Sequence, residues 1–447
     1  TLGIHQYLLS AGSASNYFAL SFDNNDKWQV DSYGTGANAF YMHTGDMLFR
    51  DTGAWYHLVA VLDTTQSTGT NRFKLYVNGS QVDLTVGTNV PPEDADQLVN
   101  STTEHRIGRI VFGSTTNYFD GNLTDIHFID GSALTPSSFG SADSNGVWQR
   151  STYSGSYGTN GYHICDFANT GTIGNDTSGQ GNNYSANNFS TTAGSGNDVL
   201  FDFPTNDTEN TDSGAGGEVT GNYACINPLL KPDTQTVTLS NGYLDFSSGA
   251  ASGQYGTRVC SIPVSSGKWY AEFTVGAVSN GIFFGITNDP MGDSNFIGGH
   301  STSYGYVNNG QKYNNGSGSS YGASFTANDV IGIALDLDND QVTFFKNGSS
   351  QGVAFSSLPS GTYVMGISGT GSATAVCNFG QRPFEYAAPS NFKCLTSFSL
   401  PTPAIADGSD YFDTVLYSGD GSSSKTVTGY SFTPDFLWIK ERTNNGG

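Results

Sequence analysis

The residue types best suited to binding chemistry gather in one Gly-, Asn- and Tyr-rich run, FIGGHSTSYGYVNNGQKYNNGSGSSYGASF, at residues 296–325. Tyrosine offers a flat apolar face and a hydroxyl at a low entropic cost, while asparagine and serine supply adaptable hydrogen bonds. We therefore predict a recognition surface on which a sugar ring can stack. Its candidate ligand-binding residues are His300, Tyr304, Tyr306, Tyr313, Asn314 and Tyr321.

The same run admits a structural alternative. Tyr304 and Tyr306 are two positions apart, so on a strand both side chains would point inward to a core. Tyr313 and Tyr321 stand among Gly, Asn and Ser, which favours an exposed loop. We expect the inward orientation for the first pair and the loop for the second.

Hydrolytic chemistry finds little support in the sequence. A retaining or inverting glycosidase needs paired carboxylates, but the strand triplet E-x-D-x-x-E is absent and the seven glutamates are dispersed. A GxSxG string at residues 318–322 centres on Ser320, yet neither the strand before it nor the helix after it that a nucleophile elbow requires is readable. We predict no catalytic residue and no enzymatic activity.

Metal-binding motifs are equally weak. The string DLDNDQ at residues 336–341 imitates an EF-hand loop, but Gln341 and Asn347 occupy the positions where glycine and glutamate are needed, so we predict a polar β-turn. The five cysteines lack CxxC spacing and are odd in number, which favours small buried hydrophobic residues over a metal site or a complete disulfide framework. The metal ligands, if there are any, stay unknown.

The charge balance excludes one class of partner. With 17 basic and 39 acidic residues the chain carries a net charge of −22, which repels nucleic-acid phosphates. Only 13% of residues are charged, so solubility rests on Ser, Thr, Asn and Gly, and we expect an extracellular or virion-surface setting. No apolar run approaches the roughly 20 residues of a membrane span, and we expect Thr1 to be an internal position of a longer protein.

Alternation of apolar and polar residues predicts an all-β chain. The segments WYHLVAVLD, NRFKLYVNG and DIHFID read as strands, and no long helix is indicated. Two hairpins are predicted at Asn78-Gly79 and Asn347-Gly348, because these pairs accept the positive φ angles of a type I′ turn. One short helical turn is expected at residues 135–139, opened by Pro136.

Composition suggests where the domains divide. We expect a sandwich at residues 1–150, a Gly/Asn/Ser-rich joint with some strands at 151–233, a second sandwich at 234–398 and the start of a further, truncated β domain at 399–447. Residues 205–222 read as a linker or a long surface loop. Two prolines within residues 400–408 mark the last boundary.

The first of these regions resembles the LamG and concanavalin A-like jelly-roll family. WYHLVAVLDTT, KLYVNG, RIGR and FDGNLTDIHFIDGSALT follow one another in that family's order, although its first strand is not recognisable ahead of Thr1. The string DTSGQGNNYS at residues 176–185 is similar to an opening of such domains, but it stands after the first unit. The resemblance implies calcium as a candidate cofactor, with no ligands that the sequence identifies.

Residues from about 234 to 386 are similar to SPRY domains. GKWYAEFTV, IFFGITND, YGY, DVIGIALDLDNDQVTFFKNG and NFGQRPFEY occur in that family's order. SPRY sandwiches are protein-binding modules, and the whole arrangement, with a trailing FTPDFLWIK, resembles tail-fibre or adhesin-type surface proteins of marine phages.

These features predict a non-enzymatic adhesion or receptor-binding protein of the cell exterior or virion surface, which holds a cell-surface glycan or protein through loops at the sandwich ends. Individually weak contacts would be multiplied in a homo-oligomer, for which a trimer is the expected form. A purely structural fibre or spacer, which needs no ligand, is the alternative. A polysaccharide depolymerase is a third possibility.

Overall fold

The computed structural model describes residues 3–34, 39–51, 53–112, 115–143, 148–165, 172–202, 212–231, 234–251, 253–290, 296–401, 405 and 408–440. It divides into two compact units, Thr1–Ser141 with Gln149–Leu400, and Ala142–Trp148 with Pro401–Gly447. Throughout these described residues the regular elements are strands and four three-residue 3-10 helices, which confirms the all-β prediction. None of the helices there is long and apolar enough to cross a membrane.

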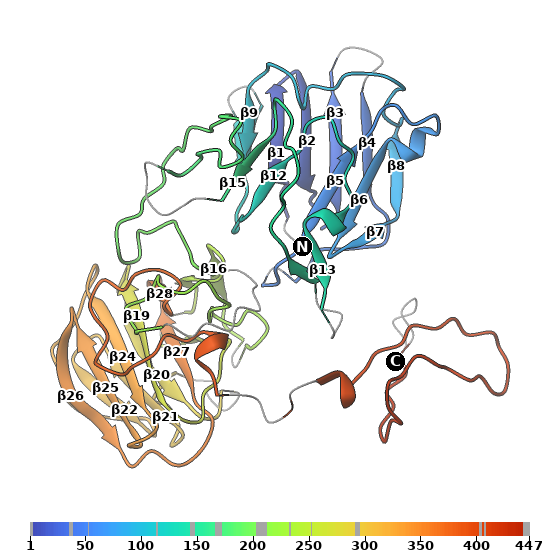
Figure 1. Cartoon of the computed structure of the whole chain (residues 1–447). Coiled ribbons are helices and arrows are strands. Elements are labelled where there is room, and N and C mark those ends of the chain that lie inside the picture. Colours follow the sequence, from blue (N-terminus) through green and yellow to red (C-terminus); the bar gives the residue numbers. More distant parts are fainter. Residues whose placement is uncertain are drawn as a thin grey trace. The chain divides into compact units, whose positions relative to one another are not determined.

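The N-terminal sandwich has two antiparallel sheets (Figure 1, blue). The six-stranded sheet has the order β8-β4-β3-β2-β1-β9. Its strands are β1 (Gln6–Ser13), β2 (Asn16–Phe22), β3 (Trp28–Tyr33), β4 (Phe40–Thr44), β8 (Leu84–Thr88) and β9 (His105–Ile107). The three-stranded sheet consists of β5 (Leu58–Leu62), β6 (Phe73–Val77) and β7 (Ser80–Val82). Alternate side chains of both sheets, Trp28 and Phe73 among them, form one apolar core.

Short strands and helical turns complete this region. They are β10 (Arg109–Phe112), β11 (Thr115–Tyr118), β12 (Ile126–Phe128), β13 (Gly140–Ala142), β14 (Trp148–Arg150), β15 (Tyr162–Ile164), η1 (Gly69–Asn71) and η2 (Pro136–Ser138). Pro136 opens η2, as predicted, because proline lacks only an N–H that a first helical position leaves unused. β12 pairs with β15, so the chain beyond residue 150 contributes a strand beside the first region.

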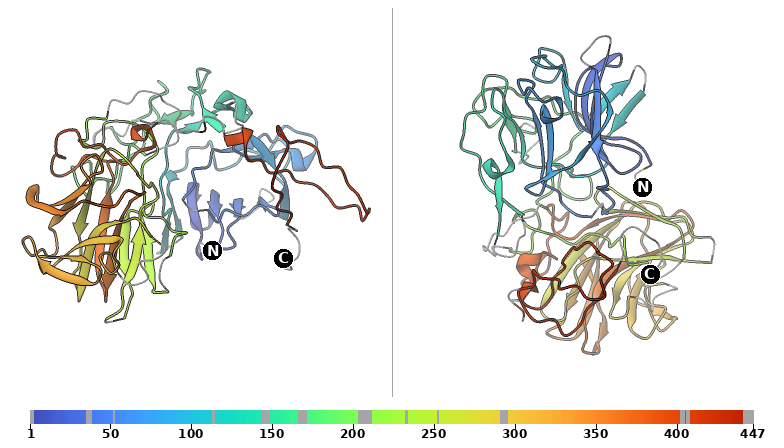
Figure 2. Two further views of the ribbon diagram at one scale, coloured as in Figure 1. Left: turned by 90° about the horizontal axis from the view of Figure 1, so that it is seen from below. Right: turned by 90° about the vertical axis from the view of Figure 1, so that its right-hand side faces the viewer.

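In its described residues the second sandwich contains thirteen strands in two antiparallel sheets (Figures 1 and 2, yellow to orange). The seven-stranded sheet runs β16 (Val237–Ser240), β17 (Asp245–Ser248), β28 (Thr374–Asn378), β19 (Lys268–Val275), β24 (Val330–Asp336), β25 (Gln341–Lys346) and β26 (Ser349–Ser356). The six-stranded sheet runs β18 (Gly256–Val259), β27 (Val364–Thr370), β20 (Gly281–Thr287), β21 (Ser303–Val307), β22 (Gln311–Asn314) and β23 (Ser317–Ser320).

Both predicted Asn-Gly hairpins are present. Asn78 and Gly79 have φ angles of 46° and 81° between β6 and β7, and Asn347 and Gly348 have φ angles of 46° and 74° between β25 and β26. Positive φ at both central positions is the signature of the type I′ turn. Local turn chemistry therefore fixes the register of these two strand pairs.

Strand β19 is buried on both faces. Trp269 and Phe273 point into the sandwich core, whereas Tyr270 belongs to a separate cluster with Phe384 and Cys394. Residues 379–395 cover this outer face, where the Tyr270 N–H donates to the Lys393 carbonyl at 2.9 Å. The covering chain explains why successive residues of β19 are buried instead of alternating with exposed ones.

A buried carboxylate holds this cover in place. Glu272 on β19 is 2% exposed and accepts hydrogen bonds from the backbone N–H groups of Glu385 (2.8 Å) and Tyr386 (2.9 Å). Burial raises the pKa of Glu272 to about 7, although the two backbone donors and the Tyr270 hydroxyl act to lower it. The folded state thus favours a protonated or partly protonated side chain near neutral pH.

The Asn-rich joint also packs onto the second sandwich in its described residues. Arg382 is 1% exposed and donates to the carbonyl oxygens of Ser195 at 3.0 Å and Asn197 at 2.8 Å. The carboxylate of Asp212, 4% exposed, accepts from the Cys394 N–H at 2.9 Å. Residues 212–222 of the predicted linker or surface loop are therefore fixed against residues 380–396, whereas residues 205–211 lie outside the described part.

The second compact unit has only η4 (Gly408–Asp410) as a regular element in its described C-terminal part, residues 408–440, whereas η3 (Ser397–Ser399) ends just before the unit. The apolar FLWIK stretch forms no strand ladder here, because no described segment pairs with it. Phe436 and Trp438 are consequently 81% and 83% exposed.

Because the folded state favours protonated Glu272, the second sandwich should become less stable as the pH rises and this proton is lost. The folded pKa of about 7 exceeds the ordinary 4.5, so the stabilisation is fully present below pH 4.5 and is lost as the pH passes through about 7. We expect the free energy of unfolding to fall by up to about 3 kcal/mol over this range. Urea unfolding at a series of pH values measures it.

Variants at single carboxylates show how much of this pH dependence comes from Glu272. Glu272→Gln should lower stability at acidic pH, since the amide keeps only one acceptor oxygen, and should flatten the pH dependence. Asp202, whose pKa burial raises to about 6, contributes equally in both proteins. Asp46→Asn, at an exposed carboxylate of the other sandwich, should keep the wild-type slope. An unchanged slope in Glu272→Gln would contradict this role.

Removal of the Arg382 guanidinium should loosen the joint. Arg382→Met leaves the buried carbonyls of Ser195 and Asn197 without their donor, which should cost about 3 kcal/mol of unfolding free energy. Lys231→Met, at an exposed cation of the same joint, should change it by less than about 0.5 kcal/mol. Limited proteolysis should also cut residues 190–202 faster in Arg382→Met, and equal rates would argue against the anchoring role.

Candidate functional site

Tyr304 and Tyr306 lie in the core of the second sandwich. Tyr306, on β21, has no exposed surface, and its hydroxyl donates to the carbonyl of Ala323. Tyr304 is 8% exposed, and its ring centroid lies 5.1 Å from that of Phe355. Neither ring has a free face for a ligand. Both tyrosines point inward from a strand, as their spacing predicted.

The segment expected to be a loop around Tyr313 and Tyr321 is a β-hairpin. Tyr313 and Asn314 belong to β22, and Tyr321 directly follows β23. The Tyr321 hydroxyl donates to the Gly352 carbonyl and accepts from the Phe344 N–H, so this ring closes one end of the core. The loop prediction failed because alternating Tyr, Asn and Ser also satisfy two polar strands at a sheet edge.

Asn314 and His300 act mainly within the fold. The Asn314 side-chain amide donates to the carbonyls of Ser303 at 2.9 Å and Ser301 at 3.1 Å. The His300 carbonyl accepts from the backbone N–H groups of Ser303 and Asn315. His300 itself is half-buried. The side-chain amide of Asn314 therefore stabilises the turn at residues 300–303, and its N–H groups are used in these hydrogen bonds.

Tyr313 differs from the other candidates because it joins an aromatic cluster on the outer face of the six-stranded sheet. We define the Tyr255–Tyr313 patch as Tyr255, Phe283, Phe296 and Tyr313. Phe283 and Phe296 are nearly buried, with ring centroids 4.7 Å apart. Tyr255 lies 4.9 Å from Phe296, and Tyr313 lies 5.5 Å from Phe283. Both tyrosines are half-buried, so each keeps part of its surface in solvent.

Strand order creates this patch. Tyr255 directly precedes β18, and Tyr313 lies on β22. Phe283 lies on β20, which stands between β18 and β22 in the sheet. Burial and the neighbouring Tyr313 both raise the pKa of Tyr255. Gly318 on β23 has no Cβ, and one there would lie 2.5 Å from Cζ of Tyr313. Sequence reasoning missed Tyr255 because nothing local relates it to Tyr313.

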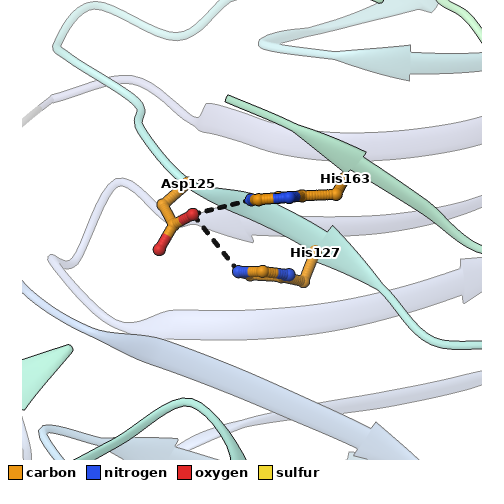
Figure 3. A group of neighbouring side chains, drawn as sticks. All are labelled: Asp125, His127 and His163. Carbon is orange, nitrogen blue, oxygen red and sulfur yellow. Dashed lines mark hydrogen bonds and ion pairs between the residues drawn. The ribbon is translucent and has the colours of Figure 1, made fainter. Parts of the chain in front are cut away.

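A second cluster, Asp125, His127 and His163, lies where β12 pairs with β15 (Figure 3). His127 and His163 are directly opposite each other in the antiparallel register, and their rings stack at 4.1 Å with an interplanar angle of 10°. Asp125 directly precedes β12, and its carboxylate contacts the ring of His127. Asp125 has a φ of 51°, a left-handed conformation that aspartate tolerates.

The Asp125 carboxylate joins the two imidazoles. Its Oδ1 lies 2.7 Å from Nε2 of His163 and 3.3 Å from Nε2 of His127. Its Oδ2 lies 3.3 Å from Nη1 of Arg150. Burial acts to raise the pKa of Asp125, but hydrogen bonds from the two histidines and the charge of Arg150 outweigh it, and the pKa falls well below its ordinary value. The carboxylate is therefore ionised at neutral pH.

Hydroxyl groups contact the far side of each imidazole. Nδ1 of His127 lies 2.8 Å from the Tyr157 hydroxyl, and Nδ1 of His163 lies 3.0 Å from the Thr177 hydroxyl. Cys165, which is exposed, has its sulfur 3.7 Å from the same Nδ1 of His163. The signal available in the sequence was the Asp-x-His spacing on a predicted strand. His163 could not be added without the register.

The remaining sequence candidates have structural roles. Residues 337–340 form the predicted turn between β24 and β25, and the Asp336 carboxylate accepts from Nζ of Lys268 at 2.8 Å. Ser320 ends the exposed strand β23, and residues 321–329 directly after it contain no helix. Cys260, Cys377 and Cys394 are buried, as expected, and burial raises the pKa of the Cys260 thiol to about 12. All five cysteines are free thiols.

Comparison with known families matches three parts of the chain. Residues 3–139 match the concanavalin A-like lectin/glucanases superfamily, residues 268–382 match the SPRY domain, and residues 407–446 match a domain of unknown function, DUF7483. The zebrafish (Danio rerio) Ran-binding protein 10 is 36% identical over 130 residues, which is 28% of this chain and 21% of that protein. Human (Homo sapiens) Ran-binding protein 9 is 35% identical over 130 residues, 28% of this chain and 18% of that protein.

These matches span about a fifth of the length of the curated relatives. Among solved structures, the SPRY domain of human HERC1 is 23% identical, covers 34% of this chain and 96% of that chain, and has a TM-score of 0.31. The order of the matched regions agrees with the two sandwiches described above. The chain therefore contains a concanavalin A-like domain followed by a SPRY domain.

Proposed function

We propose that this protein is a non-enzymatic binding protein of the cell exterior or virion surface, which holds a cell-surface glycan at the Tyr255–Tyr313 patch of its SPRY domain. The observation that carries the proposal is a pair of half-buried tyrosines resting on two nearly buried phenylalanines. A ring fixed in this way loses little entropy when a sugar stacks on it.

The chemistry of the patch favours a neutral, hydroxyl-rich ligand. Its four members carry no charge, and their polar atoms are the two phenolic hydroxyls. The Tyr313 hydroxyl lies 3.2 Å from Oε1 of Gln311 on the same strand, so an amide group is also near. Aromatic faces beside hydroxyl and amide groups provide stacking together with hydrogen bonds, the combination that a sugar ring uses.

The scaffold suits binding without catalysis. The patch is supported by strands whose other faces form the sandwich core, so its geometry is rigid. A single aromatic contact contributes only about 0.5–1.5 kcal/mol beyond the area it buries. Useful affinity would therefore come from several copies, which is the reason to propose a homo-oligomer, with a trimer as the first form to test. We also propose, from the resemblance of the sequence to phage tail-fibre or adhesin-type proteins, that the chain is part of such a surface protein.

A glycan array probed with the labelled 447-residue chain tests the function. We expect a defined set of hits whose apparent affinity falls at least tenfold in Tyr255→Ala and in Tyr313→Ala, because each variant removes one stacking face. Tyr118→Ala, at a 60% exposed tyrosine of the other sandwich, should keep the wild-type signal. Near-ultraviolet circular dichroism verifies that each variant is folded.

Three outcomes would contradict the proposal. An array without hits would contradict a glycan ligand. Hits that persist in the Tyr255→Ala/Tyr313→Ala double variant would contradict binding at the Tyr255–Tyr313 patch. Release of reducing ends from a bound polysaccharide would show a depolymerase and would overturn the non-enzymatic assignment.

A further inference from the structure

We propose that Asp125, His127 and His163 form a zinc-binding site in the N-terminal part of the chain. Oδ1 of Asp125 and one nitrogen of each imidazole lie within 4.8 Å of one another (Figure 3). Ligand atoms about 2.0–2.1 Å from a tetrahedral zinc ion are about 3.3 Å apart. The 3.3 Å between Asp125 and His127 already fits, and the 2.7 Å between Asp125 and His163 needs to open by about 0.6 Å. The two rings stack in parallel with centroids 4.1 Å apart, so both also have to turn until their Nε2 lone pairs point at one ion.

The donor set selects the class of ion. Two imidazole nitrogens with one carboxylate oxygen suit zinc and its neighbours in the first transition row, whereas calcium requires six to eight oxygen donors. Three protein ligands leave one tetrahedral position for water or a ligand from solution. Arg150 holds Oδ2 of Asp125, which leaves Oδ1 as the oxygen that faces the two histidines.

The outer hydrogen bonds suit metal binding at Nε2. Each Nε2 faces Asp125, and the Tyr157 hydroxyl lies 2.8 Å from Nδ1 of His127. The Thr177 hydroxyl lies 3.0 Å from Nδ1 of His163 and donates to the His163 carbonyl. Zinc bound at Nε2 requires the proton on Nδ1, and the same hydroxyls then accept it. The proton of each ring moves from Nε2 to Nδ1 through solvent when the ion binds. Metal-binding histidines commonly have such a partner on the far nitrogen.

The site is partly shielded from water. The side chains of His127, Asp125 and His163 are 12%, 20% and 18% exposed, so they are reachable from solvent. The ring of Phe139 lies 5.2 Å from that of His127 on one side. Because Asp125 and His163 are 38 positions apart, a bound ion would connect β12 and β15 and stabilise their pairing.

Isothermal titration of the chelator-treated full chain with zinc sulfate tests the site. We expect one zinc per chain, with affinity reduced at least tenfold in His127→Gln, His163→Gln and Asp125→Asn. His43→Gln, at a histidine of β4 outside the cluster, should bind like the wild type, and calcium chloride should give no competing heat. Absence of stoichiometric binding, or unchanged affinity in His127→Gln and His163→Gln, would overturn the proposal.

Two further variants guard against misfolding and against a different ligand. Tyr157→Phe keeps the ring and removes the hydroxyl beside His127, so we expect about 10- to 100-fold weaker zinc binding while the metal-free melting temperature changes little. Cys165→Ser should leave affinity unchanged, because its sulfur faces Nδ1 of His163 and not Nε2. A sulfur neighbour in the zinc X-ray absorption spectrum would contradict the assigned ligands, as would full affinity in Tyr157→Phe.

Discussion

Burial of strand β19 on both faces is the constraint on which the SPRY domain depends. Trp269 and Phe273 require the opposite sheet as a partner, and Tyr270 and Glu272 require a cover on the other side. Residues 379–395 supply this cover, and their backbone N–H groups satisfy the Glu272 carboxylate. Arg382 then draws the Asn-rich joint against the same region. One sheet is thus covered by its own chain, while the other keeps a partly open aromatic face.

The two candidate sites arise from sheet geometry in different ways. In the Tyr255–Tyr313 patch, side chains at β18, β20 and β22, alternate strands of one sheet, extend an apolar base, and the tyrosines at its edge stay partly in solvent. In the Asp125–His127–His163 cluster a single cross-strand pair brings two imidazoles face to face. A patch of this kind tolerates small shifts, since stacking is broad in geometry. The cluster does not, because a one-residue slip would place His127 on the opposite face.

Sequence alone predicted what local chemistry determines. The Asn-Gly turns, the Pro136 helical turn and the ordered strands of both sandwiches follow from backbone preferences and alternation. The inward orientation of Tyr304 and Tyr306 follows from their spacing. The partners of Tyr313 and His127 could not be predicted, because strand order and register are non-local. The packing of the joint could not be predicted, because composition does not reveal the buried contacts that Asp212 makes there or those that Arg382 of the second sandwich makes with it.

Charge explains why donor geometry, and not overall acidity, should decide metal selectivity. A net charge of −22 attracts every cation, but screening limits that attraction to about 8 Å at physiological ionic strength. Such a field raises local cation concentration without distinguishing zinc from calcium. Arg150 beside Asp125 even opposes binding electrostatically. Selectivity must therefore come from the two imidazole nitrogens, and their convergence depends on the one register in which His127 faces His163.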